Sequence, residues 1–249
     1  MCGRYAAAKD PAALVEEFEA SAPAEALAPD YNVAPTKRVY IVVDRRRDEA
    51  RERSIEVARW GLVPSWAKDP TIGSRLVNAR AETLAEKPAF RSAYAKRRCL
   101  VPADGYYEWY QPVEGATGRS GRPLKQPFYI HRIDGRSLAM AGLYEWWKDP
   151  TVEADDPAAW RLTCTVITTA ATDAIGRIHD RMPMVIEAND WAAWLDPGVT
   201  DDPQHLLTPA GDVGLEAYPV STAVNNVRNN GPELIEGVEA ASETPAADI

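Results

Sequence analysis

Met1-Cys2-Gly3-Arg4-Tyr5 opens the chain, and the fold that we predict is a scaffold around this stretch. Cys2 is a small residue, so we expect removal of Met1 to leave it as the first residue of the mature protein. The α-amine of a terminal cysteine has an ordinary pKa of roughly 7.7–8.0 and its thiol one of about 8.5, so both are partly nucleophilic near neutral pH. The amine can condense with an aldehyde to an imine, and the thiol can close on the imine carbon to give a thiazolidine.

A structural role is the simpler interpretation of the same stretch. A cysteine near a chain end is commonly a small, partly buried side chain, and Gly3 and Arg4 would then have no part in any chemistry. The reactive interpretation is favoured because residues elsewhere in the chain predict a pocket around Cys2.

Composition places the chain among globular proteins of a reducing compartment. Hydrophobic residues make up 45% of the 249 positions and charged residues 26%, which is ordinary for such a protein. The sequence has no run of the ~18 apolar residues that a membrane helix needs, and charged residues interrupt any signal peptide. Cys2, Cys99 and Cys164 form neither a disulfide pattern nor a metal-binding pair. We therefore predict a cytoplasmic protein without a membrane partner.

The net charge is −9, from 28 basic and 37 acidic residues, which argues against a protein that coats nucleic acid unspecifically. Eight of the acidic residues lie in a polar loop at residues 153–156 and from Glu233 onward, so the remaining body is close to balanced and a local basic groove is compatible with it. We predict one domain over residues 1–236 and an acidic, disordered tail over residues 237–249.

The pattern of apolar residues predicts many strands and few helices. Asp10-Pro11 caps a helix over residues 12–20, and a second helix covers residues 88–96. Strands are expected at 39–43 and 55–60, joined as a hairpin whose turn starts at Arg45, and at 99–101, 105–109, 128–132, 138–143 and 162–168. With no internal repeat and no βαβ rhythm, this order predicts a single α+β domain with a curved, mostly antiparallel, barrel-like sheet flanked by short helices.

Three polar residues stand out from apolar or stiff surroundings. Asn78 ends an apolar strand, where its amide must find partners. Glu108 lies among aromatic residues in Tyr106-Tyr107-Glu108-Trp109, where desolvation would raise its pKa and suit it to proton transfer. His179 lies in a turn-like charged segment and is the natural acid or base near neutral pH.

Each of the three also has an ordinary explanation. Asn78 could cap a helix or end a strand, Glu108 could face solvent from an alternating strand, and His179 could be a satisfied loop residue. Taken singly, these explanations are the commoner ones. Together with a terminal cysteine, the set is typical of a nucleophile with its acid, base and orienting group.

Arginine and tryptophan residues near these positions suit a nucleic acid. Arg4 and Arg80 carry planar guanidinium groups that can bind phosphates, and Trp66, in a loop containing proline, can stack on or wedge between bases. Arginines also pair with carboxylates and tryptophans also fill cores, so these residues alone are a weak signal. Their combination favours a single-stranded or distorted nucleic acid.

Eight short segments spread over nearly the whole length form a distinctive combination. They are MCGRY from Met1, NVAPT from Asn32, WGLVPSW from Trp60, NARAET from Asn78, RCLVPADGYYEW from Arg98, AGLYEW from Ala141, IHDRMP from Ile178 and VSTAVN from Val220. In these segments the chain resembles the SOS-response-associated peptidase (SRAP) family, whose members shield abasic sites in DNA.

This resemblance implies a role for each candidate residue. Cys2 would bond covalently to the ring-opened aldehyde of an abasic site in single-stranded DNA, with Asn78 holding its α-amine. Glu108 would move protons during imine formation, ring closure and reversal, and His179 would assist opening of the deoxyribose ring. The DNA would be bound by further residues: Arg4, Arg80 and Arg181 on phosphates, Trp66 on a kinked strand, and Thr168 in the lining of the site.

The resemblance has implications for partners and processing too. A monomer suffices for one-to-one capture, and the mechanism needs no metal or organic cofactor. The family name implies an autopeptidase activity, with Glu108 taking part in exposing Cys2. Because only Met1 precedes Cys2, an ordinary aminopeptidase would serve equally well.

Two other functions fit parts of the sequence. Glutamine amidotransferases with an N-terminal nucleophile also begin with cysteine, but this chain is too short for the synthase domain that normally follows, and Glu108 and His179 have no role in that scheme. A non-catalytic binder of single-stranded nucleic acid would use Trp66 and the arginines alone, and would bind DNA equally well without Cys2.

Overall fold

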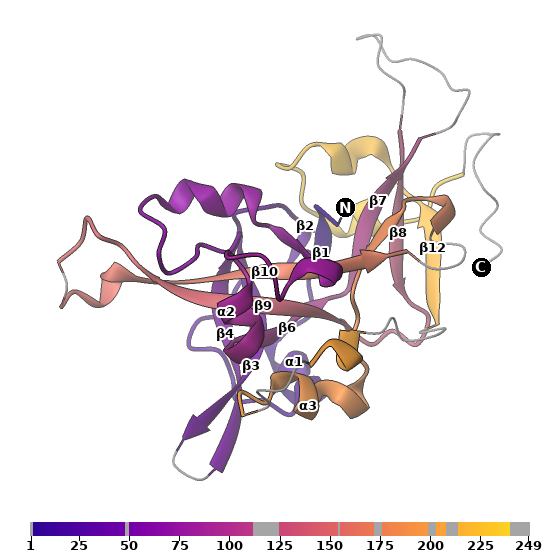
Figure 1. Cartoon of the computed structure of the whole chain (residues 1–249). Coiled ribbons are helices and arrows are strands. Elements are labelled where there is room, and N and C mark those ends of the chain that lie inside the picture. The colour runs from indigo at the N-terminus through magenta and orange to yellow at the C-terminus, as the bar shows by residue number, and fades with distance from the viewer. Residues whose placement is uncertain are drawn as a thin grey trace.

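The computed structural model describes residues 2–47, 50–111, 125–153, 155–171, 176–198, 203–207 and 214–239, and Figure 1 shows how their strands and short helices are arranged. Most of the predicted acidic tail lies outside these ranges. Within them, Gly237 still makes a bridge to Val220, so the ordered backbone reaches the start of the predicted tail.

Five strands close into a barrel. β10 pairs with β4 in parallel, and the remaining pairings, β4–β3, β3–β6, β6–β9 and β9–β10, are antiparallel. The strands are β3 (Arg38–Arg47), β4 (Ala50–Trp60), β6 (Arg98–Ala103), β9 (Leu138–Lys148) and β10 (Trp160–Ala170). Farther along β10, two short strands extend the sheet: β5 (Asn78–Arg80) and β11 (Arg181–Pro183). The predicted barrel-like, mostly antiparallel sheet in one α+β domain is confirmed.

A second, antiparallel sheet carries the N-terminal stretch. Its strands follow the order β12, β8, β7, β1, β2. They are β1 (Tyr5–Ala7), β2 (Asp30–Val33), β7 (Gly105–Tyr110), β8 (Gln126–Arg132) and β12 (Leu215–Pro219). Tyr5 pairs with Tyr106 across β1 and β7, so the beginning of the chain lies against the strand that carries Glu108.

Two apolar clusters form most of the core. One joins the two sheets and contains Cys2, Tyr5 and Trp60 among its buried members. The other packs the helices on the barrel, and the stacked rings of Phe18 and Trp191, 4.6 Å apart between centroids, join α1 to α3. The helices are α1 (Pro11–Phe18), α2 (Arg91–Lys96) and α3 (Trp191–Leu195).

Most predicted elements appear near their expected bounds, with one clear error. The Asp10 carboxylate caps α1 by accepting the Ala12 N–H at 2.8 Å, as expected. The turn predicted from Arg45 is wrong, because β3 continues to Arg47. Arg45 forms an ion pair with Glu56 of β4 at 3.2 Å, and such cross-strand charge pairing lets a polar strand extend.

The loop from Gly61 to Val77 carries Trp66 and leads to Asn78. Gly61 has a φ of +125°, and a Cβ at Gly61 would lie 2.6 Å from the Gly73 carbonyl oxygen. The indole N–H of Trp60 donates to the Val77 carbonyl at 2.8 Å. This close backbone contact and the hydrogen bond together set where β5 begins, with Asn78 paired to Val166 of β10.

Replacing Gly61 with alanine should destabilise the protein more than the same change at Gly135. Gly135 also has a positive φ, of 72°, but a Cβ there has no atom within 4 Å. We expect Gly135→Ala to lower the free energy of unfolding by about 1 kcal/mol and Gly61→Ala by about 3 kcal/mol, because the latter adds a steric clash to backbone strain. Urea unfolding of both variants measures the difference, and equal losses would contradict the contact described.

Candidate active site

Cys2 lies buried between the two sheets. Its side chain belongs to the cluster that joins them and is 0% exposed. The Tyr107 N–H donates to the Arg4 carbonyl at 2.9 Å, and the Asn78 side-chain amide donates to the Cys2 carbonyl at 2.7 Å. Strand pairing on one side and Asn78 on the other therefore hold the start of the chain in place.

The Cys2 thiol is neutral in this environment. Burial, and after it the nearby Glu108 carboxylate, raise its pKa well above the ordinary value of a thiol. A thiolate is the better nucleophile, so any reaction of Cys2 needs a neighbouring group that takes the thiol proton.

Glu108 is suited to take and return that proton. Its side chain is only 3% exposed, which excludes the solvent-facing orientation considered from the sequence. Burial raises its pKa from 4.5 to about 7, so near neutral pH both the acid and the carboxylate are populated. The aromatic neighbours in the sequence indicated this desolvation correctly.

His179 faces Glu108 from the loop before β11. Its Nε2 lies 3.9 Å from a Glu108 oxygen, and its Nδ1 accepts the Arg181 main-chain N–H at 3.0 Å. In the neutral ring the hydrogen is therefore on Nε2, on the side of Glu108. Burial lowers the pKa of His179 and so favours this neutral form. The Asp180 carboxylate lies 2.9 Å from Nδ1 and forms an ion pair with the imidazole ring only when the ring is protonated.

Asn78 has one amide atom in use and one without a partner. Its Nδ2 holds the Cys2 carbonyl, whereas its Oδ1 is buried and has no hydrogen-bond partner among the described residues. A buried acceptor without a donor costs free energy, so this oxygen is available to a donor that the described residues do not supply.

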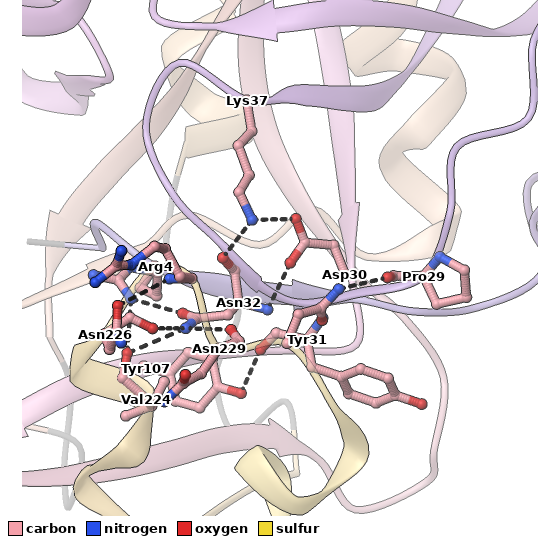
Figure 2. A network of polar contacts seen from close by, with 12 residues as sticks. Arg4, Pro29, Asp30, Tyr31, Asn32, Lys37, Tyr107, Val224, Asn226 and Asn229 are labelled. Carbon is pink, nitrogen blue, oxygen red and sulfur yellow. Dashed lines mark hydrogen bonds and ion pairs between the residues drawn. The ribbon is translucent and has the colours of Figure 1, made fainter.

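Arg4 is anchored by the protein itself, as Figure 2 shows. Its Nη1 donates to the Asn32 side-chain oxygen at 2.7 Å and to the Val224 carbonyl at 2.8 Å. The guanidinium lies over the Trp109 ring, 5.7 Å from its centroid. The phosphate contact predicted for Arg4 would have to use guanidinium nitrogens other than Nη1.

Asn32, which was not among the residues predicted for the site, holds Arg4 in place. It is fully buried, and its Nδ2 lies within hydrogen-bond distance of three carbonyl oxygens, those of Val224, Asn226 and Asn229, at 3.2, 3.1 and 3.0 Å (Figure 2). The segment after β12 is thereby tied to β2 and, through Arg4, to the N-terminal arm. Its place in the NVAPT segment was the only available signal.

The other predicted DNA contacts fall into two groups. Trp66 and Arg80 are exposed, Trp66 at 60%. Thr168 is buried, and its carbonyl accepts from Arg181 at 2.6 Å. Arg181 is also paired with Glu82, a residue that the sequence analysis did not single out. The structure thus brings Cys2, Asn78, Glu108 and His179 together and places Trp66 and Arg80 at the surface.

Neither a metal centre nor a membrane helix is found in the described part of the chain. No group of three or more histidine, cysteine, aspartate or glutamate side chains there is arranged to hold a metal ion. None of its helices combines the length and apolar character required to cross a bilayer.

Comparison with known proteins assigns the family. The model of the SOS response associated peptidase (SRAP) family matches residues 1–227. The chain belongs to this family. Among its SRAP relatives, the Bacillus subtilis abasic site processing protein YoqW is 38% identical over 240 residues, which cover 95% of this chain and 99% of that protein. The Escherichia coli abasic site processing protein YedK is 31% identical, covering 96% of this chain and 100% of YedK.

Solved structures agree with the fold of this SRAP chain. A crystal structure of a Bacteroides thetaiotaomicron protein matches it with a TM-score of 0.78 and 25% identity, covering 96% of this chain and 100% of that one.

A vertebrate relative is similar in sequence over most of this chain. The Xenopus tropicalis abasic site processing protein HMCES is 31% identical, and the match covers 84% of this chain and 66% of HMCES.

The raised pKa of Glu108 predicts a pH dependence of stability. Because the folded protein keeps a proton on this group up to about pH 7 and the unfolded chain releases it near 4.5, stability is lost as the pH rises through this window. Glu108→Gln removes this loss, which amounts to up to about 3 kcal/mol. Urea unfolding at pH 5 and pH 8 should show a smaller decrease for the variant than for the wild type. Parallel decreases would contradict the buried position of this carboxyl group.

Proposed function

We propose that this protein captures abasic sites in single-stranded DNA through a covalent bond to Cys2 once Met1 has been removed. Relatives that share 31–38% of its sequence are named abasic site processing proteins. The proposal links that name to the geometry around Cys2 and belongs to the response to DNA damage. Membership of the SRAP family favours capture over hydrolysis of glutamine.

The observation that carries the proposal is the unpartnered oxygen of Asn78. In the unprocessed chain the Cys2 nitrogen is a peptide amide. Removal of Met1 turns it into an amine with additional hydrogens, and the buried Oδ1 of Asn78 would accept one of them. The two ends of one amide would then hold the carbonyl and the amine of the same residue, which fixes the direction in which the amine attacks.

The first half of the reaction would join the amine to the sugar. His179 in its protonated form would donate its Nε2 proton to the ring oxygen as the deoxyribose opens, and the Glu108 carboxylate would take the proton of the hydroxyl that becomes the aldehyde oxygen. The neutral amine would add to the aldehyde carbon to form a carbinolamine, and Glu108 in its acid form would protonate the hydroxyl that leaves as water. A protonated imine between Cys2 and the DNA results.

The second half would close the ring. The Cys2 sulfur would add to the carbon of the protonated imine while the thiol proton passes to the Glu108 carboxylate, and the nitrogen, which keeps its hydrogen, would become the secondary amine of a thiazolidine. One water is released in total. Reversal takes the same steps backwards, so one carboxyl with a pKa of about 7 would serve both directions.

Binding of the DNA strand would come from Trp66 and from arginine residues beside the site. Trp66, 60% exposed, would stack on a base, and Arg80 and Arg181 would contact phosphates. Thr168 would line the site beside Arg181. One chain provides every group in this scheme, so a monomer suffices, and a reducing cytoplasm would keep the Cys2 thiol available.

Removal of Met1 is the peptide cleavage on which this function depends. An aminopeptidase or the protein itself would perform it, and in the second case Glu108 would shuttle the proton as the Met1–Cys2 bond breaks. The intact mass of purified Glu108→Gln separates the two routes. Retained Met1 supports self-cleavage, and its loss supports an aminopeptidase.

Replacing Cys2 with serine should separate formation of the imine by the amine from closure of the ring by sulfur. With a single-stranded oligonucleotide containing an abasic site, the wild type should form an adduct that survives heat and denaturant on a gel. Cys2→Ser keeps the amine and should give an adduct only after borohydride reduction of the imine, because its hydroxyl is a far weaker nucleophile than a thiol. An adduct of Cys2→Ser that is stable without reduction would contradict closure by sulfur. Glutaminase activity without any adduct would favour the amidotransferase.

Glu108→Gln should slow both closure and release of the adduct. We expect each rate to fall about 100-fold, the lower range for loss of a general acid–base group. Time courses should use protein shown by mass to lack Met1, treated with an aminopeptidase where needed. Glu187→Gln, which removes a carboxylate paired with Arg132, is the control and should react like the wild type. If both rates of Glu108→Gln equal those of the wild type, Glu108 has no part in the mechanism.

A further inference from the structure

Glu82 holds the guanidinium group of Arg181 through two parallel contacts. Nη1 of Arg181 lies 2.6 Å from one Glu82 oxygen and Nη2 lies 3.1 Å from the other. The Arg181 side chain is 13% exposed and that of Glu82 is 52% exposed. The Arg181 hydrogen bonds lower the pKa of Glu82, so it is a carboxylate throughout the neutral range.

Arg181 is held firmly from the other side. Its Nη2 donates to the Thr168 carbonyl at 2.6 Å, and its main-chain N–H donates to His179 at 3.0 Å. Arg80 is the register partner of Thr168 across β5 and β10, and the Arg181 side chain bonds to the same residue, so two of the three predicted phosphate-binding arginines meet at Thr168. Glu82, on the short helix Ala81–Thr83 and half exposed, is the partner that can leave.

A carboxylate and a phosphate present the same pair of oxygens to an arginine fork. We propose that Glu82 occupies the position of a DNA phosphate on Arg181 in the free protein and is displaced when the strand binds. This inference rests on the proposed function, because it takes the ligand of Arg181 to be single-stranded DNA.

A Glu82 carboxylate that occupies Arg181 in this way would make the protein selective for damaged strands. A half-exposed ion pair is worth little, so its displacement costs little, yet it neutralises Arg181 in the free state. Binding of undamaged DNA is thereby weakened, and such a strand dissociates. A strand with an abasic site is instead retained by its covalent bond to Cys2. The overall charge of −9 acts in the same direction.

Glu82→Gln should tighten binding of an oligothymidine that has no abasic site. We expect a dissociation constant roughly fivefold lower by fluorescence anisotropy, the scale of an ion pair at this exposure. The slope of log K against log salt should steepen by up to roughly 0.7, the contribution of one more phosphate contact on a single strand. Glu187→Gln, which also removes a carboxylate paired with an arginine, should change neither quantity.

The same substitution in an Arg181→Gln background tests whether Glu82 acts through Arg181. With no guanidinium to release, Glu82→Gln should give neither tighter binding nor a steeper salt slope. Equal gains in both backgrounds would show general repulsion and overturn the proposal. Unchanged binding of oligothymidine by Glu82→Gln alone would overturn the proposal too. Weaker binding would also overturn it, because it would mean that Glu82 only positions Arg181.

Failure of this inference is distinguishable from failure of the proposed function. If the wild type binds no single-stranded DNA and forms no adduct with an abasic strand, the function itself is wrong. If the wild type does both and Glu82→Gln binds like the wild type, only the role of Glu82 is wrong.

Discussion

The antiparallel pairing of β1 with β7 is the contact on which the rest of this structure depends. It places Tyr5 opposite Tyr106, two residues before Glu108 on the same strand. Successive side chains of a strand alternate between its faces, so Tyr106 and Glu108 share the face against which Cys2 is buried. A chain end, normally the most mobile part of a protein, becomes part of the core by this pairing.

Burial then determines the protonation state of each group in the site. It raises the pKa of the Cys2 thiol, raises that of Glu108 to about 7 and lowers that of His179. A neutral thiol, a carboxyl group half protonated near neutral pH and a neutral imidazole can exchange protons without a large change in charge. Water would weaken all three effects, so the buried position of Cys2 and the chemistry proposed for it have one cause.

Local signals in the sequence predicted the elements that depend on neighbours in the chain. Aromatic residues around Glu108 indicated its burial, and Asp10-Pro11 indicated the start of α1. The turn at Arg45 was predicted wrongly because its strand is stabilised by Glu56, a partner on another strand. The parallel pairing of β4 with β10, which closes the barrel, joins segments about 100 residues apart and leaves no local pattern.

The residues of the candidate site also divide into those with a recognisable signal in the sequence and those whose partners appear only in the folded chain. Cys2, Asn78, Glu108 and His179 were found from unusual polar residues in apolar segments and from the family resemblance. Glu82 and Asn32 were missed because each looks like an ordinary polar residue until its partners, Arg181 and Arg4, are brought to it by the fold.

The most direct test of the central claim is an intact mass measured after denatured thiols have been alkylated. The chain has three cysteines. The free protein should lack Met1 and take up three alkyl groups. Its adduct with an abasic oligonucleotide should weigh one water less than its two components and take up two alkyl groups, because the third sulfur is in the ring. An adduct that retains Met1, or one in which three thiols are alkylated, would contradict capture by the terminal aminothiol.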